Sequence, residues 1–358
     1  MKKIKFLLEE NDYDWKDFKN YLISFNWDKV IFLLCLYVGG IIGFYYFITL
    51  QLKVYTYLWI YHVFMIGGIG LGPGAHRYFS HRSFKATRPF KLFLMFCQTI
   101  AGQYTVLFWC QVHRVHHKYA DTEKDPTNIN RGFMFAHLYW AFRFSPECKA
   151  ALDTVDVSDL KSDKDVMFQY RYFPIFSFLL CILYPTIVPY LLWNETLWIS
   201  FWANMFRWLL NYNQMSFANS LMHMYGKKPY DKNVSAAEYL FCILYTYGEG
   251  YHNYHHVFPW DYKAAEFGDF THFNISTIML DVCARFGLVY DRKVVSKNMI
   301  ERRKARTGDG SNWLTSNEIL KNPIWGYGDI DMDVDDKIDI HGYLFDQNNN
   351  IIDKKNES

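Results

Sequence analysis

The sequence predicts an all-α integral membrane protein with four transmembrane helices in two hairpins and a cytosolic helical cap rich in histidine. Two observations predict this class. Hydrophobic residues make up 51% of the 358-residue chain and aromatic residues 20%, and they are concentrated in runs long enough to cross a bilayer core. In addition, most of the 13 histidines fall in short clusters outside these runs.

Four apolar runs define the predicted spans, at about residues 30–50, 54–74, 173–193 and 197–217. Each is close to the roughly 20 residues that a helix needs to cross the hydrocarbon core. The fourth run is the weakest because it contains Asn204, Arg207 and Asn211, which a membrane helix must turn toward protein or a polar cavity. A further apolar segment, Phe90 to Cys110, is predicted to lie at the membrane surface, because a span there would separate the first two histidine clusters.

The placement of lysines predicts the orientation of the spans. Several lysines precede the first run, whereas Lys53 is the single basic residue in the two short turns that join paired runs. Because positive charge is retained on the cytosolic side, both termini and every histidine cluster are predicted to face the cytosol. Residues 1–28 are too polar for a cleavable signal peptide, so the first span is expected to act as the targeting signal.

The chain divides into three predicted parts. Residues 1–28 form a cytosolic leader, residues 29–328 a membrane domain with cytosolic blocks at 75–172 and 218–328, and residues 329–358 a polar, disordered tail. The seven cysteines show no CxxC pairing, as expected in a reducing compartment. A net charge of +2 without a basic stripe of interleaved aromatic residues predicts no nucleic-acid partner.

The clustered histidines are spaced as metal ligands. HRVHH and HNYHH each place histidines at i, i+3 and i+4, which share a helix face, so each box is expected to aim three imidazoles at one point. Nine imidazole donors exceed what one tetrahedral zinc ion uses, so the cap is predicted to carry a dimetal site. A zinc hydrolase is disfavoured because no glutamate separates paired histidines as in HExxH. The clustered residues are His76, His81, His113, His116, His117, His223, His252, His255 and His256.

Longer segments surround these histidines: GAHRYFSHRSFKA at 74–86, DPTNINRGFMFAH at 125–137, NSLMHMYGKKPYD at 219–231 and GEGYHNYHHVFPWDY at 248–262. Together with the four spans, they resemble the membrane fatty acyl-CoA desaturases of the stearoyl-CoA or Δ9 type over about residues 30–328. Two further segments are most similar to insect members of that family, RTGDGS at 306–311 and PIWGYGD at 323–329.

The resemblance implies an activity and a cofactor. It implies an oxygen-dependent enzyme of the endoplasmic reticulum membrane that introduces a cis double bond, at Δ9, into a saturated C16 to C18 acyl-CoA. The nine histidines would hold two Fe(2+) ions and Asn219 a metal-bound water, with no catalytic residue beyond these. The sequence has no haem-binding HPGG block, so electrons are expected from a separate cytochrome b5 and its reductase.

The resemblance also implies residues that line a substrate tunnel. Phe64 and Gly68 occupy the positions that limit chain length, and the small Gly68 is expected to admit a long chain with Phe64 as its stop. Gln103 and Trp109 match the tunnel bend. The Thr-Trp pair that joins them in the family is replaced here by Met215 and Ser216.

Other departures from the family concern the headgroup. An Arg-Asp pair before the second histidine box is replaced by Gln111 and Val112, and an Asn is replaced by Tyr104. These departures keep open a desaturase of a non-CoA lipid and a related diiron hydroxylase or acetylenase. A non-catalytic membrane protein that binds metal or lipid is the alternative of a different class, and the complete ligand set weighs against it.

Overall fold

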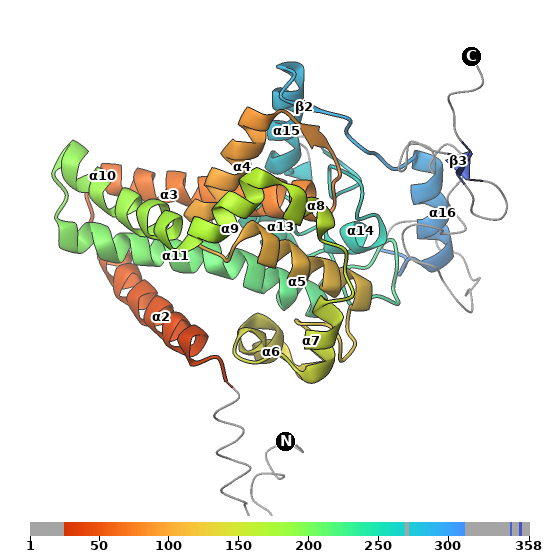
Figure 1. Cartoon of the computed structure of the whole chain (residues 1–358), viewed down its shortest axis with the longest axis horizontal. Helices are drawn as coiled ribbons and strands as arrows, with labels where there is room; N and C mark the ends of the chain where they lie inside the picture. The colour runs from red at the N-terminus through yellow and green to blue at the C-terminus, as the bar shows by residue number, and fades with distance from the viewer. Residues whose placement is uncertain (1–24, 269–271, 312–343, 346–350, 353–358) are drawn as a thin grey trace, which may run out of the picture.

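The computed structural model describes residues 25–268, 272–311, 344–345 and 351–352. These residues are mostly helical, which confirms the predicted all-α class (Figure 1). Two short antiparallel strand pairs accompany the helices, β1 Lys85–Ala86 with β2 Val289–Tyr290, and β3 Leu344–Phe345 with β4 Ile351–Ile352. Most of the predicted leader, the predicted boundary at 328 and the PIWGYGD segment lie outside the described residues.

Within the part of the chain that the structure describes, three helices are long and apolar enough to cross a membrane, so the chain is a multi-pass membrane protein. They are α2 (Trp27–Ile48), α3 (Val54–Ile69) continued by the π-helix η2 (Gly70–Ser80), and α9 (Lys164–Ser177) continued by the π-helix η5 (Phe178–Leu183) and α10 (Tyr184–Trp193).

The helices α4 (Arg88–Ala101) and α5 (Val106–Tyr119) would together qualify as a span, but they are bent by 85°. The bend begins at Gly102, whose left-handed conformation (φ 66°) ends α4. A helix pair bent in this way is not a continuous span, and its location at the membrane surface stays a prediction.

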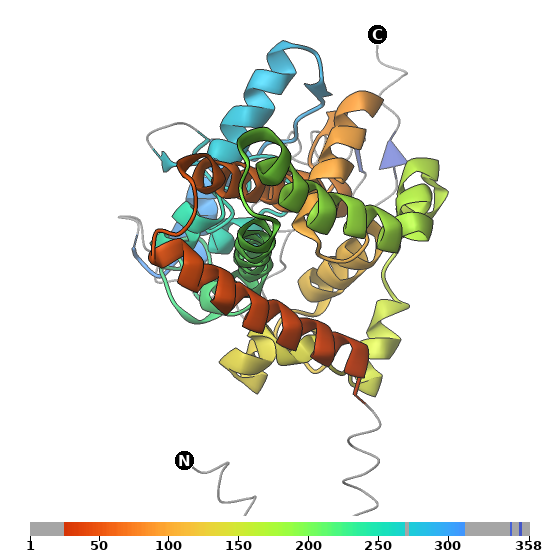
Figure 2. The ribbon, with the colours of Figure 1, turned by 90° about the vertical axis from the view of Figure 1, so that its left-hand side faces the viewer.

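The predicted fourth span is α11 (Leu197–Asn219), a 23-residue helix that packs against α2, α3 and α10. Figure 2 shows it end-on between these helices. Its polar residues are buried in protein: Arg207 donates hydrogen bonds to the carbonyl oxygens of Ile100 and Cys181 and to Asn204 Oδ1. This central position explains why α11 is long enough to span but less apolar than the helices around it.

Close packing of α2 against α11 depends on glycine. A Cβ atom on Gly43 would lie 1.9 Å from the carbonyl oxygen of Trp202, and one on Gly39 would lie 2.8 Å from Met205 Cε. Gly39 and Gly43 form a GxxxG pattern, which lets membrane helices approach closely. The glycine run at 67–74 acts in the same way, since a Cβ on Gly70 would lie 2.0 Å from the Gln98 nitrogen of α4.

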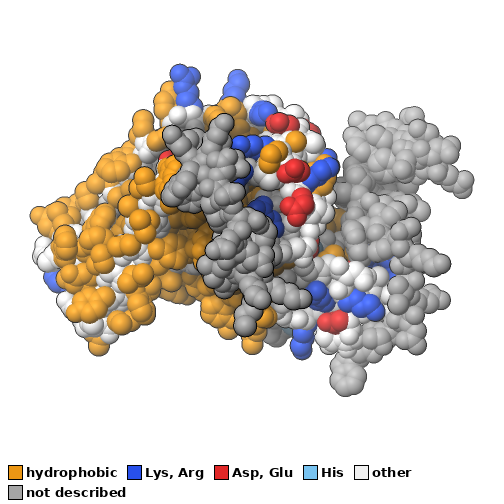
Figure 3. All heavy atoms as spheres, turned by 90° about the horizontal axis from the view of Figure 1, so that it is seen from below, with side chains coloured by type: hydrophobic (Ala, Val, Ile, Leu, Met, Phe, Trp, Pro, Cys, Tyr) orange, Lys and Arg blue, Asp and Glu red, His pale blue; other side chains and the backbone are white. Residues whose placement is uncertain are grey.

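The remaining helices are short and form the cap. Figure 3 shows hydrophobic side chains covering the part of the molecule built from α2, α3 and α10, whereas Lys, Arg, Asp and Glu side chains gather on the opposite part. Exposed apolar residues such as Leu34, Leu58 and Leu191 belong to the first part. The cap elements are η3 (Ile129–Arg131), α6 (Phe133–His137), η4 (Tyr139–Ala141), α7 (Pro146–Leu152), α8 (Ser158–Ser162), α12 (Leu221–Met224), α13 (Leu240–Tyr245), α14 (His252–Val257), α15 (Ile275–Arg285) and α16 (Lys297–Thr307).

Candidate metal centre

The first two histidines are aligned by a π-helix. His76 and His81 are five residues apart, a spacing that places side chains on different faces of an α-helix. In η2 the His81 N–H donates to the His76 carbonyl at 3.2 Å, an i to i+5 hydrogen bond that brings the two residues one turn apart. Pro73 lies inside this segment and lacks the N–H that an α-helical bond requires. The wide turn therefore directs both imidazoles toward the same point.

The nine histidines form two separate groups, and within each group the ligand atoms lie within 4.8 Å of one another. The expectation that each HxxHH box aims three imidazoles at one point is wrong. Neighbouring helical residues project about 100° apart, so the histidines at i+3 and i+4 face different sites. In both boxes the histidine at i shares a site with the one at i+4. The five-histidine cluster contains His76, His81, His113, His117 and His255. The four-histidine cluster contains His116, His223, His252 and His256.

The distances between ring nitrogens fit metal coordination. In the five-histidine cluster, the Nε2 atoms of His76 and His255, and those of His81 and His113, are 2.8 Å apart. In the four-histidine cluster, the Nε2 atoms of His223 and His252 are 3.0 Å apart. Two nitrogens bound at about 2.0–2.1 Å to one ion lie roughly 2.8–3.4 Å apart at octahedral or tetrahedral angles. The two clusters are therefore suitable for one metal ion each.

Carboxylates orient two of the imidazoles from behind. Nδ1 of His76 lies 2.7 Å from Glu249 Oε2, and Glu249 also accepts a hydrogen bond from Arg77. Nδ1 of His116 lies 3.0 Å from Asp125 Oδ1. A carboxylate that accepts the Nδ1 proton leaves Nε2 free to bind a metal and fixes the plane of the ring. Sequence reasoning did not assign Glu249 or Asp125, although both stand in the GEGYHNYHH and DPTN segments.

The protonation state of the clusters also favours metal binding. Burial, reinforced by the charges of neighbouring histidines, holds the pKa of His117, His252 and His255 well below the usual value. Burial acts in the same direction on His116, but the adjacent Asp125 carboxylate outweighs it and raises the pKa of that residue. Neutral imidazole is the form that binds metal ions, so most of the nine donors need no deprotonation at neutral pH.

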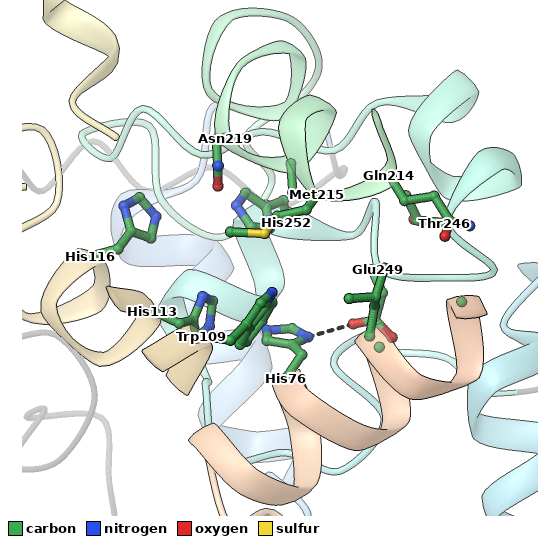
Figure 4. A pocket seen from close by; sticks show the side chains of 14 residues that line it. His76, Trp109, His113, His116, Gln214, Met215, Asn219, Thr246, Glu249 and His252 are labelled. Atoms are coloured by element: carbon green, nitrogen blue, oxygen red, sulfur yellow. Dashed lines mark hydrogen bonds and ion pairs between the residues drawn. The ribbon is translucent and has the colours of Figure 1, made fainter. Parts of the chain in front are cut away.

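Both clusters border one cavity (Figure 4). Trp109 stacks on His113 with ring centroids 5.0 Å apart, and Met215 and Leu71 add apolar surface. Asn219, the last residue of α11, lines the same cavity, and its buried Nδ2 has no hydrogen-bond partner among the described residues. An unpaired amide beside metal-binding histidines is suited to hold a water molecule.

The predicted tunnel residues do not all reach this cavity. Gly68, Trp109 and Met215 line it. Gln103 is buried and donates to the Asn211 carbonyl, Ser216 is buried within α11, and Phe64 packs against Tyr245 and Tyr247. The space beside Gly68 is not open either, because a Cβ atom there would lie 2.7 Å from the Tyr247 ring. Tyr247 was missed because it stands just before GEGYHNYHH and carries no metal-ligand signature.

Comparison with known proteins settles the family. A family model described as Fatty acid desaturase matches residues 58–268, the region that holds all nine clustered histidines. The chain belongs to the fatty acid desaturase family. As a member, it is an oxidoreductase, and the resemblance seen in its histidine boxes is confirmed.

Several curated relatives match this desaturase over most of its length. It is 42% identical over 313 residues to an acyl-CoA Delta-9 desaturase of Acheta domesticus, covering 87% of this chain and 84% of that protein. It is 43% identical over 293 residues to a stearoyl-CoA desaturase of Bos taurus, covering 81% of this chain and 80% of that protein. An acyl-CoA Delta12-desaturase of Acheta domesticus is 39% identical over 318 residues, covering 87% and 85%.

Replacing Asp125 with asparagine should weaken metal binding by the four-histidine cluster of this desaturase. The amide cannot reproduce the charge that fixes the His116 ring, and loss of such a partner typically costs about 10–100-fold in metal affinity. Titration of the purified metal-free protein against a competing chelator would measure the change. Glu123→Gln, an exposed change in the same loop, is the control. Equal affinities for the two variants would contradict the orienting role of Asp125.

Proposed function

We propose that this chain is an oxygen-dependent acyl-CoA desaturase that introduces a cis double bond at Δ9 into a saturated chain of 16 to 18 carbons. The observation that carries this proposal is the pair of histidine clusters bordering one largely apolar cavity. A long acyl chain has no polar group near its middle, so an enzyme must position it by shape. Relatives named for acyl-CoA and stearoyl-CoA desaturation support the substrate class.

The nine histidines would hold two Fe(2+) ions, five and four donors respectively, and Asn219 would hold a water beside them. The donor chemistry fits iron, because imidazole is a common ligand for this metal and the four-histidine cluster leaves coordination positions for further ligands. Bound iron would supply the chemistry that activates O2 for removal of hydrogen from two adjacent methylenes. With two electrons and two protons from outside, the balanced products are the unsaturated chain and two waters.

The chain's own residues position the substrate and exclude water. Trp109 presents an indole face beside His113, while Met215 and Leu71 complete an apolar wall. Gly68 and Gly72 bring the α3–η2 backbone close to the cavity without adding side chains. This wall would hold one C–C bond next to the clusters and keep bulk water from the reacting atoms.

The lysine distribution supports a membrane protein with both termini and the cap in the cytosol. By the family resemblance of its histidine boxes, this membrane would be that of the endoplasmic reticulum. Electrons would then come from cytochrome b5 and its reductase on the same side. The Delta12 relative makes bond position the least constrained part of the proposal.

Expression in desaturase-deficient yeast tests the proposal. New monounsaturated C16 or C18 acids, with the double bond at Δ9, are expected from the wild-type chain and not from His116→Ala. Gas chromatography with mass-spectrometric location of the double bond makes the measurement. Hydroxylated or acetylenic products would indicate the related oxidases instead. An unchanged profile from a well-expressed protein that binds iron but consumes no O2 would support a non-catalytic role.

A further inference from the structure

Tyr247 packs against Gly68, a residue that lines the cavity. Its neighbour Thr246 lines the cavity beside Gln214, and Figure 4 shows both at the end opposite His116. A Cβ atom on Gly68 would lie 2.7 Å from Tyr247 Cε2 and 3.0 Å from Cδ2. The tyrosine ring therefore fills the space that a side chain at residue 68 would occupy.

The ring is held by its backbone and by its neighbours. Tyr247 has a φ of 59°, a left-handed conformation that is strained for a residue other than glycine. Its carbonyl accepts a hydrogen bond from the Ser276 N–H at 3.1 Å, which ties the loop to α15. Phe64 packs edge-on against the ring with centroids 5.8 Å apart. These contacts fix the ring between α3 and the loop that precedes α14.

The hydroxyl of Tyr247 is buried without a protein partner. The side chain is 7% exposed, and its Oη has no hydrogen-bond partner among the described residues. A buried polar group without a partner is unfavourable, as is the backbone strain. What this side chain adds to the fold here is therefore the bulk of its ring beside Gly68.

We propose that Tyr247 closes the cavity and sets the length of acyl chain that fits between its ring and the metal ligands. This inference rests on the proposed function, because the occupant is taken to be an acyl chain. The methyl end of the chain stops against the ring beside Gly68. Because Gly68 has no side chain, Tyr247 can approach the α3–η2 helix. A larger side chain at residue 68 would occupy the space that the tyrosine ring fills, so bulk at either position closes the same end of the cavity.

Three variants separate the ring from the backbone and the hydroxyl. Tyr247→Gly removes the ring and accepts the positive φ without strain. Tyr247→Phe keeps the ring and removes the unpaired hydroxyl. The double variant Tyr247→Gly with Gly68→Leu returns bulk from the other side of the shared space. Tyr245→Ala is the matched control, because Tyr245 also packs on Phe64 but bonds the Leu210 carbonyl and does not face Gly68.

The assay gives the purified full-length, iron-loaded protein an equal mixture of C16, C18 and C20 acyl-CoA, together with O2, cytochrome b5, its reductase and a reductant that supplies the electrons. The ratio of C20 to C16 product does not depend on how much enzyme is active. We expect Tyr247→Gly to raise the ratio of C20 to C16 product about tenfold or more. One methylene group in an apolar pocket typically changes the preference between two substrates by about tenfold or more. Tyr247→Phe and Tyr245→Ala should leave the ratio unchanged, and the double variant should restore it.

Binding provides a second readout. Each acyl-CoA should raise the melting temperature of the purified protein when it binds. In Tyr247→Gly alone, the acyl-CoA that gives the largest rise should have a longer chain than in the wild type. Wild-type protein that forms no product from any chain would refute the proposed function. The inference about Tyr247 would be overturned, and the proposed function left standing, by a different pair of results. In that case the wild-type protein forms product, and Tyr247→Gly binds metal normally but keeps the wild-type ratio of C20 to C16 product. A shift of equal size in Tyr247→Phe would also overturn it, because the ring would then not be the cause.

Discussion

Replacing His116 or His117 with alanine is expected to reduce desaturation by roughly two orders of magnitude or more, although the two adjacent residues belong to different histidine clusters. His116 belongs to the four-histidine cluster and His117 to the five-histidine cluster. Loss of a residue that only orients a ligand costs about 10–100-fold, and loss of the ligand itself should cost at least as much.

Double variants make the division between the clusters measurable. His116→Ala with His223→Ala removes two ligands from one cluster, so the protein should retain about half of its metal. His116→Ala with His117→Ala removes one ligand from each cluster and should weaken both sites. Metal content per chain by plasma mass spectrometry, at increasing chelator concentration, measures both cases. The plot of metal content against chelator concentration should be biphasic for His116→Ala with His223→Ala. It should be monophasic for His116→Ala with His117→Ala.

His137→Ala is the control for these variants. Its ring bonds Ser220 Oγ and Asn213 Oδ1 and belongs to neither cluster. It should retain both metal ions. Identical chelation curves for the two double variants would show that the nine histidines do not form two independent sites.

Replacing Gly43 with leucine is expected to cause the largest loss of stability among the changes considered away from the metal centre. The first side-chain carbon would already meet the Trp202 carbonyl at 1.9 Å, so α2 and α11 must separate. Overpacking of a tight interface typically costs about 1–3 kcal/mol. Because α11 ends at Asn219, movement of this helix should also reduce metal retention.

Thermal unfolding of the purified protein in one detergent would measure the effect of Gly43→Leu. Ile41→Leu is the control, because Ile41 lies on the same helix and is 62% exposed. A midpoint for Gly43→Leu equal to that of the control would mean that close contact between α2 and α11 does not stabilise the fold.

The spans and the nine histidines could be predicted because each leaves a local signal. An apolar run of bilayer length and an HxxHH spacing are visible within 20 residues or fewer. The division of each box between two sites could not be predicted in the same way. It depends on how α5 and α14 face each other, and the spacing of His116 and His117 is compatible with either grouping.

Residues that act across the fold left a weaker signal. Tyr247 meets Gly68, and Asn219 borders the cavity, through contacts between segments far apart in the sequence. Glu249 and Asp125 stand close to the histidines, but a carboxylate near a histidine in sequence need not bond to it. The polar face of α11 was recognised as requiring protein around it, whereas its partners, such as the Cys181 carbonyl for Arg207, emerge only from the packed helices.

The π-helix η2 also constrains how this chain can diverge. His76 and His81 share a cluster only because they are five residues apart on a π-helical turn. One residue more or fewer would rotate His81 away from His76 by about a quarter turn. A substitution between the two histidines leaves this spacing intact, but an insertion or deletion there removes a ligand from the cluster. The alignment of the two imidazoles therefore constrains the length of this segment, separately from the packing that constrains its composition.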